Sequence, residues 1–177
     1  MTTAKHLHVL PNPELDQRIG HLRETVLFRE LKNNDAALAA FALLMDEKIY
    51  APKSKMIVEG VESDDMYILI SGTASVFKNT PEGESFKVAI INSQSHAFFG
   101  ESGLLDKEFR SATIISEDEC HCLVLSKKAF EDFANANPHW AMPFYRTITS
   151  MVLNRLRKTN SDLSLLYRAL VAEVRGN

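Results

Sequence analysis

The most specific pattern in this sequence is Phe98-Phe99-Gly100-Glu101-Ser102-Gly103-Leu104-Leu105, followed after a four-residue gap by Arg110-Ser111-Ala112-Thr113. A glycine lets the backbone approach a ligand closely, and the free N–H groups of a short helical turn after Gly100 attract an anion. Arg110 adds a full positive charge, and its guanidinium can grip two phosphate oxygens through parallel hydrogen bonds. The pattern therefore predicts a phosphate-binding site.

Glu101 lies inside this pattern but is not suited to the same anion. An ionised carboxylate only accepts hydrogen bonds, so Glu101 suits a hydroxyl-bearing neighbour such as a ribose. Both charged residues also have a structural alternative. Arg110 can pair with Asp106 or Glu108 at the surface, and Glu101 can be a carboxylate that a helix N-terminus favours. The surrounding motif favours ligand binding for both.

The pattern resembles the phosphate-binding cassette of the cyclic-nucleotide-binding domain family. Three upstream pairs stand at family spacing as well, namely Glu59-Gly60, Tyr67-Ile68 and Ser71-Gly72. The resemblance implies a β-roll that binds a cyclic nucleotide such as cAMP. By position it gives the ribose 2′-hydroxyl to Glu101 and the cyclic phosphate to Arg110 and Ser111. Gly100 and Ser102 are then expected to offer backbone amides.

Four residues at three sites depart from the family pattern. His96-Ala97 stands where Gly-Asp is usual, Ser102 replaces an apolar residue, and Phe109 replaces a proline. None of these changes deletes a ligand-binding group. They leave open a second interpretation, in which the chain keeps the fold as a protein-interaction scaffold and no longer binds nucleotide.

A further candidate contact lies in the stretch Arg155-Leu156-Arg157-Lys158-Thr159-Asn160. In the catabolite-activator type of the family, a Thr-Ser pair after an Arg-Leu step reaches the adenine. By resemblance Thr159 matches the threonine, and Asn160 replaces the serine with a group that both donates and accepts. The alternative for Thr159 is a polar residue that fixes the register of a coiled coil. The basic residues of this stretch are otherwise expected to form a solvated helix face.

Residues 1–136 contain three successive kinds of sequence pattern, typical of irregular, helical and β structure. Residues 1–21 carry Pro11 and Pro13 with little periodicity and are predicted to form an irregular arm. Helical spacing then predicts two short helices, at 22–31 and after Asn33-Asn34-Asp35. Short β-branched and aromatic runs predict six strands, at 56–58, 66–70, 73–77, 86–90, 112–115 and 122–125. Ser126 is expected to cap another short helix. Residues 22–136 are therefore assigned to a mainly β fold, a β-roll or jelly-roll barrel with flanking helices.

Residues 137–177 are predicted to form one long helix that opens at Asn137-Pro138. Apolar residues recur there at spacings of four and three, with one polar member: Val152, Leu156, Thr159, Leu163, Leu166, Leu170 and Val174. A single barrel has little use for so long a stripe. The sequence therefore predicts a homodimer through parallel pairing of this helix.

The composition indicates an ordered protein, with 45% hydrophobic residues, a net charge of −3 and a pI near 6.1. The N-terminus lacks a signal core, and no run reaches the roughly 18 apolar residues of a membrane span, so a cytoplasmic protein without membrane attachment is expected. Family members that read DNA continue past the dimer helix into a helix-turn-helix domain. The sequence ends at Asn177, so direct sequence-specific DNA binding is not expected.

Enzymatic chemistry is not indicated by the remaining polar residues. Cys120 and Cys122 alternate on one face of a strand and are expected to be buried, reduced thiols. The histidines are scattered without ligand spacing, so no metal site is expected. No catalytic trio of nucleophile, base and orienting group stands out. The preferred interpretation is a stand-alone cyclic-nucleotide sensor that signals through its dimer helix to an unidentified protein partner.

Overall fold

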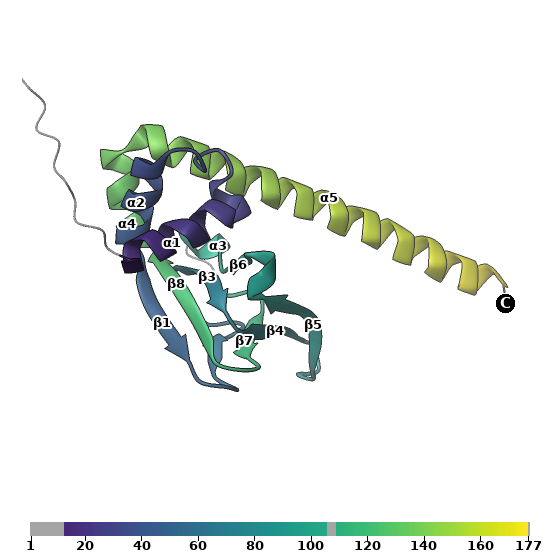
Figure 1. Cartoon of the computed structure of the whole chain (residues 1–177). Helices are drawn as coiled ribbons and strands as arrows, with labels where there is room; N and C mark the ends of the chain where they lie inside the picture. Colours follow the sequence, from purple (N-terminus) through teal and green to yellow (C-terminus); the bar gives the residue numbers. More distant parts are fainter. Residues whose placement is uncertain (1–12, 106–108, 177) are drawn as a thin grey trace, which may run out of the picture.

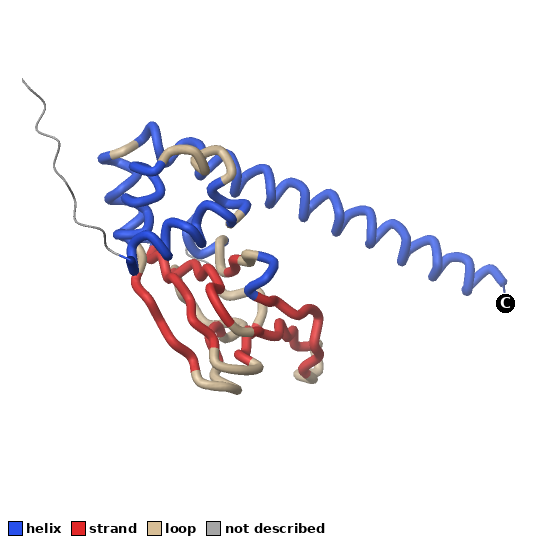
Figure 2. The backbone as a smooth tube through the Cα atoms, viewed as in Figure 1, coloured by secondary structure: helices blue, strands red, loops and turns tan. Residues whose placement is uncertain are grey.

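The computed structural model describes residues 13–105 and 109–176. Two four-stranded antiparallel sheets form a β-roll, and a group of shorter helices lies at one end of it (Figure 1). A single long helix carries the chain past the sheets to its C-terminus (Figure 2). The predicted fold class, a β-roll with flanking helices and a long C-terminal helix, is confirmed.

The first sheet has the order β1-β8-β3-β6, formed by Asp46–Tyr50, Cys120–Ser126, Asp65–Ser71 and Phe98–Phe99. The second has the order β2-β7-β4-β5, formed by Lys55–Ile57, Thr113–Ser116, Thr73–Asn79 and Ser85–Asn92. The six predicted strands are confirmed, with ends that lie at most two residues from the predicted ones. Strands β1 and β6 were not predicted.

The two missed strands lack the local signal that marks the other six. In β1, the residues from Asp46 to Ile49 are exposed, because this strand lies at a sheet edge and pairs with β8. The two residues of β6 are too few to show any period. Their position depends on β3, where the Tyr67 ring stacks on the Phe99 ring with centroids 5.3 Å apart. Both strands therefore depend on partners distant in sequence.

Helix α1 spans Pro13–Glu24, so the prediction of an irregular arm is wrong for residues 13–21. Proline is tolerated in the first turn of a helix, where its missing N–H costs nothing, and the acidic Glu14 and Asp16 suit the same turn. The predicted helix at 22–31 is also divided. A 3₁₀ turn, η1 (Val26–Phe28), follows α1 and buries Leu27 and Phe28 in the core.

The other short helices begin where the sequence predicted. Helix α2 (Asp35–Leu44) is capped by Asn34, whose side-chain oxygen accepts a hydrogen bond from the Ala37 N–H at 3.0 Å. Helix α4 (Lys127–Ala136) is capped in the same way by Ser126. Two shorter pieces, η2 (Ser93–Ser95) and α3 (Ser102–Leu105), lie between the strands. The core of the helical group contains a cluster of four phenylalanines: Phe28, Phe41, Phe130 and Phe144.

Helix α5 (Pro138–Gly176) has 39 residues and continues through Pro143. At 1.5 Å per residue it is about 58 Å long. Its first turns are held by the buried residues Ala141, Phe144 and Ile148, which pack into the helical group. Beyond them the apolar stripe is exposed, with Leu163 at 64% and Leu166 at 69%. The predicted helix is confirmed, and its seam has no cover within the described part of the chain.

Candidate functional site

The predicted cassette folds as a tight loop around one arginine. Gly100 has a φ of 77°, and a Cβ there would lie 2.9 Å from the Asp65 carbonyl oxygen. A Cβ at Gly103 would lie 2.8 Å from Nη1 of Arg110. The backbone therefore requires glycine at position 100, whereas a side chain at position 103 would displace the guanidinium group.

Arg110 is 4% exposed, and its guanidinium donates hydrogen bonds to the protein groups around it. Its Nη1 donates to the Gly100 carbonyl oxygen at 2.9 Å, and its Nη2 donates to Ser63 Oγ at 3.0 Å and to the Asp65 carbonyl oxygen. Burial lowers the pKa of Arg110, an effect that the nearby Tyr67 and Asp65 oppose. The proposed surface partners Asp106 and Glu108 lie outside the described residues.

The hydrogen bonds of Arg110 leave part of its donor capacity unused. A guanidinium has five N–H donors, and three are engaged by Gly100, Ser63 and Asp65. Within the described structure, Nε is buried without a hydrogen-bond partner. A buried unsatisfied donor is costly, and one that belongs to a cavity-lining cation fits an anionic ligand oxygen.

Glu101 connects the cassette to α5. Glu101 is 9% exposed, and its carboxylate accepts a hydrogen bond from Nη1 of Arg155 at 2.5 Å. The Arg155 side chain is 67% exposed, so it lies on the solvated helix face that the sequence predicted, but its pairing with Glu101 was not predicted. The position of Arg155 at the start of the motif that contains Thr159 was the one feature of the sequence that could have indicated this contact.

A cavity of about 1040 Å³ opens between the cassette, the β-roll strands and α5. Six of the seven predicted ligand-binding residues line it: Gly100, Glu101, Ser102, Arg110, Ser111 and Thr159. The seventh, Asn160, is exposed on α5 and does not line the cavity of its own chain. The structure therefore brings the cassette and Thr159 together around one space and leaves Asn160 outside it.

The cavity is amphiphilic. Its apolar lining comes from both sheets, the cassette and α5, and includes Ile57, Val76, Val88, Ile91, Leu105 and Val152. Besides Arg110 and Glu101, charge is supplied by Lys78, Arg155, Lys158 and Asp162. Such a space suits a ligand with one apolar ring system and one anionic group. Within the described residues, no group of three His, Cys, Asp or Glu side chains is arranged to hold a metal ion.

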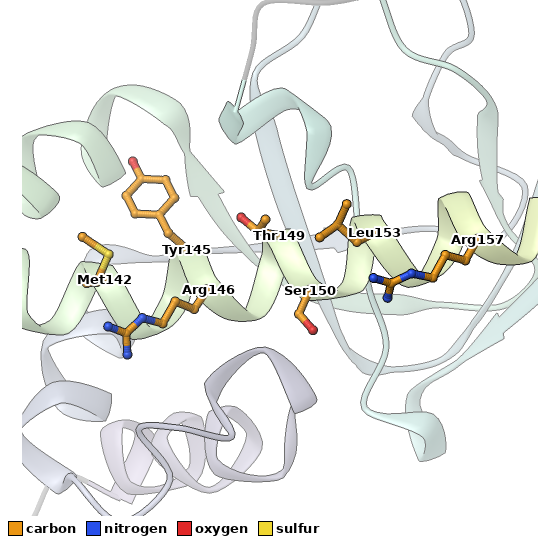
Figure 3. Close-up of a pocket in the computed structure, with 7 residues that line it drawn as sticks. All are labelled: Met142, Tyr145, Arg146, Thr149, Ser150, Leu153 and Arg157. Atoms are coloured by element: carbon orange, nitrogen blue, oxygen red, sulfur yellow. The ribbon is translucent and has the colours of Figure 1, made fainter.

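A second, smaller hollow of about 420 Å³ lies along α5 alone (Figure 3). Its lining residues come from four turns of the helix: Met142, Tyr145, Arg146, Thr149, Ser150, Leu153 and Arg157. A ligand site normally draws polar groups from several elements, and this hollow does not. Met142 and Thr149 are exposed, whereas Tyr145 packs against Phe130 of the helical core with ring centroids 5.1 Å apart, so the hollow is a surface feature of α5.

Two other groups of titratable residues do not line the cavity. Cys120 and Cys122 are fully buried, as predicted, and burial raises the pKa of Cys122 to about 12. Hydrogen bonds from Lys53, Ser75 and Lys87 lower the pKa of Glu117 to about 2. Among the helices of residues 13–105 and 109–176, none combines the length and the apolar character needed to cross a membrane.

Comparison with known proteins agrees with this geometry. Residues 47–137 match the family described as cyclic nucleotide-binding domain. The chain is 28% identical over 118 residues to the cAMP-activated global transcriptional regulator CRP of Pasteurella multocida, covering 66% of this chain and 54% of the relative. It is 34% identical over 110 residues to a cAMP-dependent protein kinase regulatory subunit of Aspergillus niger, covering 62% of this chain and 25% of the relative.

A solved structure supports the fold. The cyclic nucleotide-binding domain from Methylobacillus flagellatus superimposes with a TM-score of 0.71, 17% identity, and coverage of 84% of this chain and 81% of that one. At this identity the similarity establishes the shared fold alone. The chain spans about half of the regulator from Pasteurella multocida and a quarter of the kinase subunit.

Proposed function

The chain belongs to the cyclic nucleotide-binding domain family, and we propose that it is a sensor that binds cAMP in the 1040 Å³ cavity and signals through α5. The observation that carries this proposal is the buried Arg110, whose Nε has no hydrogen-bond partner among residues 13–105 and 109–176 and whose side chain lines the cavity. A cyclic phosphate carries one negative charge, which this guanidinium offsets.

Each predicted residue then has a role that its chemistry allows. Arg110 and the Ser111 hydroxyl bind the cyclic phosphate, with backbone amides of Gly100 and Ser102 beside it. Glu101 accepts a hydrogen bond from the ribose 2′-hydroxyl. Thr159 contacts the base, and Asn160 reaches a base from the other subunit of a dimer.

The signal passes through the contact between Glu101 and Arg155. A ribose hydroxyl that donates to the Glu101 carboxylate competes with Arg155 for the same oxygens, so ligand binding shifts the population of α5 positions. The exposed stripe of α5 supplies the homodimer interface, since an apolar surface of this length is otherwise left in water. The downstream partner is a protein that responds to this movement.

Calorimetry with cAMP tests the proposal. The wild-type protein is expected to bind cAMP, and Glu101→Gln is expected to bind it at least tenfold more weakly. A tenfold loss of affinity corresponds to about 1.4 kcal/mol, which is less than one charge-assisted hydrogen bond contributes. Glu84→Gln, on the turn between β4 and β5, is the matched control and should bind as the wild type does. Absence of cAMP binding by the wild type would refute the proposal.

The choice of base is tested by competition. A hydroxyl accepts from the exocyclic amine of adenine, whereas guanine has a carbonyl at that position, so cAMP is expected to bind about tenfold more tightly than cGMP, about 1.4 kcal/mol. Thr159→Val removes the hydroxyl at nearly constant shape and should abolish the preference. An unchanged ratio would mean that another group reads the base.

A protein-interaction scaffold is the second candidate function. It is favoured by the observation that Arg110 and Glu101 already have protein partners in Gly100, Asp65 and Arg155. The two functions differ in one measurement. By linkage, cAMP at a hundred times its dissociation constant adds about 2.7 kcal/mol of stability to a sensor and nothing to a scaffold.

A further inference from the structure

We propose that in the nucleotide-free dimer Asn160 of each subunit hydrogen-bonds to Arg155 of the other, so that the partner subunit completes the contact between Arg155 and Glu101. This inference rests on the proposed dimer but not on nucleotide binding. It gives Asn160, which lies outside the cavity of its own chain, a defined partner.

The heptad phase of α5 places these residues. The core positions of the seam are Val152, Leu156, Thr159, Leu163, Leu166 and Leu170. From Val152 to Leu170 they extend along about 27 Å of helix. In this frame Arg155 and Asp162 flank the seam on the side of the cavity, and Asn160 and Tyr167 flank it on the opposite side.

Parallel pairing brings the two flanks together. Arg155 and Asp162 occupy heptad position g, and Asn160 and Tyr167 occupy position e. In a parallel, in-register coiled coil, a residue at position g faces the residue at position e that comes five positions later in the partner. Arg155 therefore faces Asn160 of the partner subunit, and Asp162 faces Tyr167 of the partner subunit. Each pair matches a donor with an acceptor: a guanidinium with an amide oxygen, and a phenol with a carboxylate. Neither pair places like charges opposite each other.

The groups concerned are free to make these contacts. The Arg155 side chain is 67% exposed and uses one of its donors on Glu101. Asn160 is exposed, and within the described structure its side-chain amide has no hydrogen-bond partner. Arg155 can therefore hold Glu101 with one nitrogen and Asn160 of the partner subunit with another.

The consequence is that dimer formation positions a residue of the cavity. Glu101 is held by Arg155, and Arg155 is held in turn by the other subunit. Any ligand that changes the Glu101 contact then changes the dimer affinity, and the reverse effect has the same size by linkage.

Sedimentation equilibrium without nucleotide tests the pair. Asn160→Ala is expected to weaken the dimer about tenfold, because two symmetric bonds are lost, each partly screened by water. The same substitution in an Arg155→Met background should have no further effect. Asn154→Ala, the same change on the outer side of α5, is the matched control and should leave the dimer unchanged.

The outcomes separate this inference from the function proposed above. A monomeric wild type refutes both the dimer and the Asn160 contact, whatever the result with cAMP. A dimer that Asn160→Ala weakens no more than Asn154→Ala refutes the contact alone.

Disulfide cross-linking tests the parallel register. Leu166→Cys should form a disulfide between subunits, since equivalent seam residues face each other. The neighbouring Leu165→Cys, which is 59% exposed on another face of the helix, should not. Cys120 and Cys122 are buried and do not interfere. Absence of cross-linking at Leu166 would overturn the parallel arrangement and with it the contact between Arg155 and Asn160 of the partner subunit.

Discussion

Replacing Arg110 with methionine is expected to destabilise the protein even when no nucleotide is present. The guanidinium joins three segments, since it donates to Gly100 in the cassette, to Ser63, and to Asp65 at the start of β3. Methionine keeps most of the apolar stem and removes all three bonds. The substitution therefore separates the structural role of this side chain from its role in ligand binding.

The size of the effect follows from two opposing contributions. Hydrogen bonds to a charged group contribute about 1.5–3 kcal/mol each, so three give a gross loss of about 4.5–9 kcal/mol. Against this, the variant no longer pays several kcal/mol to desolvate a buried cation. The net loss expected for Arg110→Met is about 2–4 kcal/mol.

Urea unfolding of the nucleotide-free protein measures this loss as a lower midpoint with an unchanged slope. Arg157→Met, an exposed arginine on α5, is the matched control and should change stability by less than about 0.5 kcal/mol. If Arg110→Met is as stable as the wild type, the guanidinium does not hold these loops together, and the reasoning from its three bonds is wrong.

Three further outcomes follow from the structure. Gly72→Ala should lower the free energy of unfolding by about 2–4 kcal/mol, since φ is 94° and a Cβ would lie 2.4 Å from the Glu119 carbonyl oxygen. The control Gly83→Ala has a similar φ of 90° but open space around the added Cβ, so it should lower the free energy of unfolding by less. Equal losses for the two variants would show that the clash at Gly72 is relieved. Hydrogen bonding lowers the pKa of Glu117 from 4.5 to about 2, so its contribution to stability is present above pH 4.5 and is lost as the pH falls through 2. Acid unfolding of Glu117→Gln should lack this dependence, and a curve identical to that of the wild type would contradict it. Burial raises the pKa of both Cys120 and Cys122, so a thiol reagent at pH 8 should modify the folded protein far more slowly than the unfolded one, and rapid modification would show that the thiols are accessible.

The sequence predicted those parts of the fold that have a local cause. Short β-branched and aromatic runs predicted six strands, and Asn34 and Ser126 predicted helix starts, because a side chain there bonds to a backbone N–H three residues away. Strand β1 has no such signal, since its exposed residues are ordered by pairing with β8. Helix α1 was missed because Pro13 also marks loops, and only packing against the core distinguishes the two.

The cassette was predictable because its residues are close together in sequence, from Gly100 to Ser111, and form one short motif. The pair of Glu101 and Arg155 was not, because these residues are 54 positions apart and meet only when α5 crosses the cavity. The phase of α5 explains why they meet. Arg155, Thr159 and Asp162 are spaced by four and three, so they share the face that lines the cavity.

Thr159 belongs to two surfaces at once, the cavity lining and the heptad seam. A rotation of α5 that brings its hydroxyl toward a base therefore moves it out of the seam, and the opposite rotation does the reverse. The two interpretations that the sequence left open for Thr159, base contact and register residue, therefore correspond to two different rotations of α5. In the function proposed above, this shared side chain would couple nucleotide binding to helix pairing without a separate signalling element.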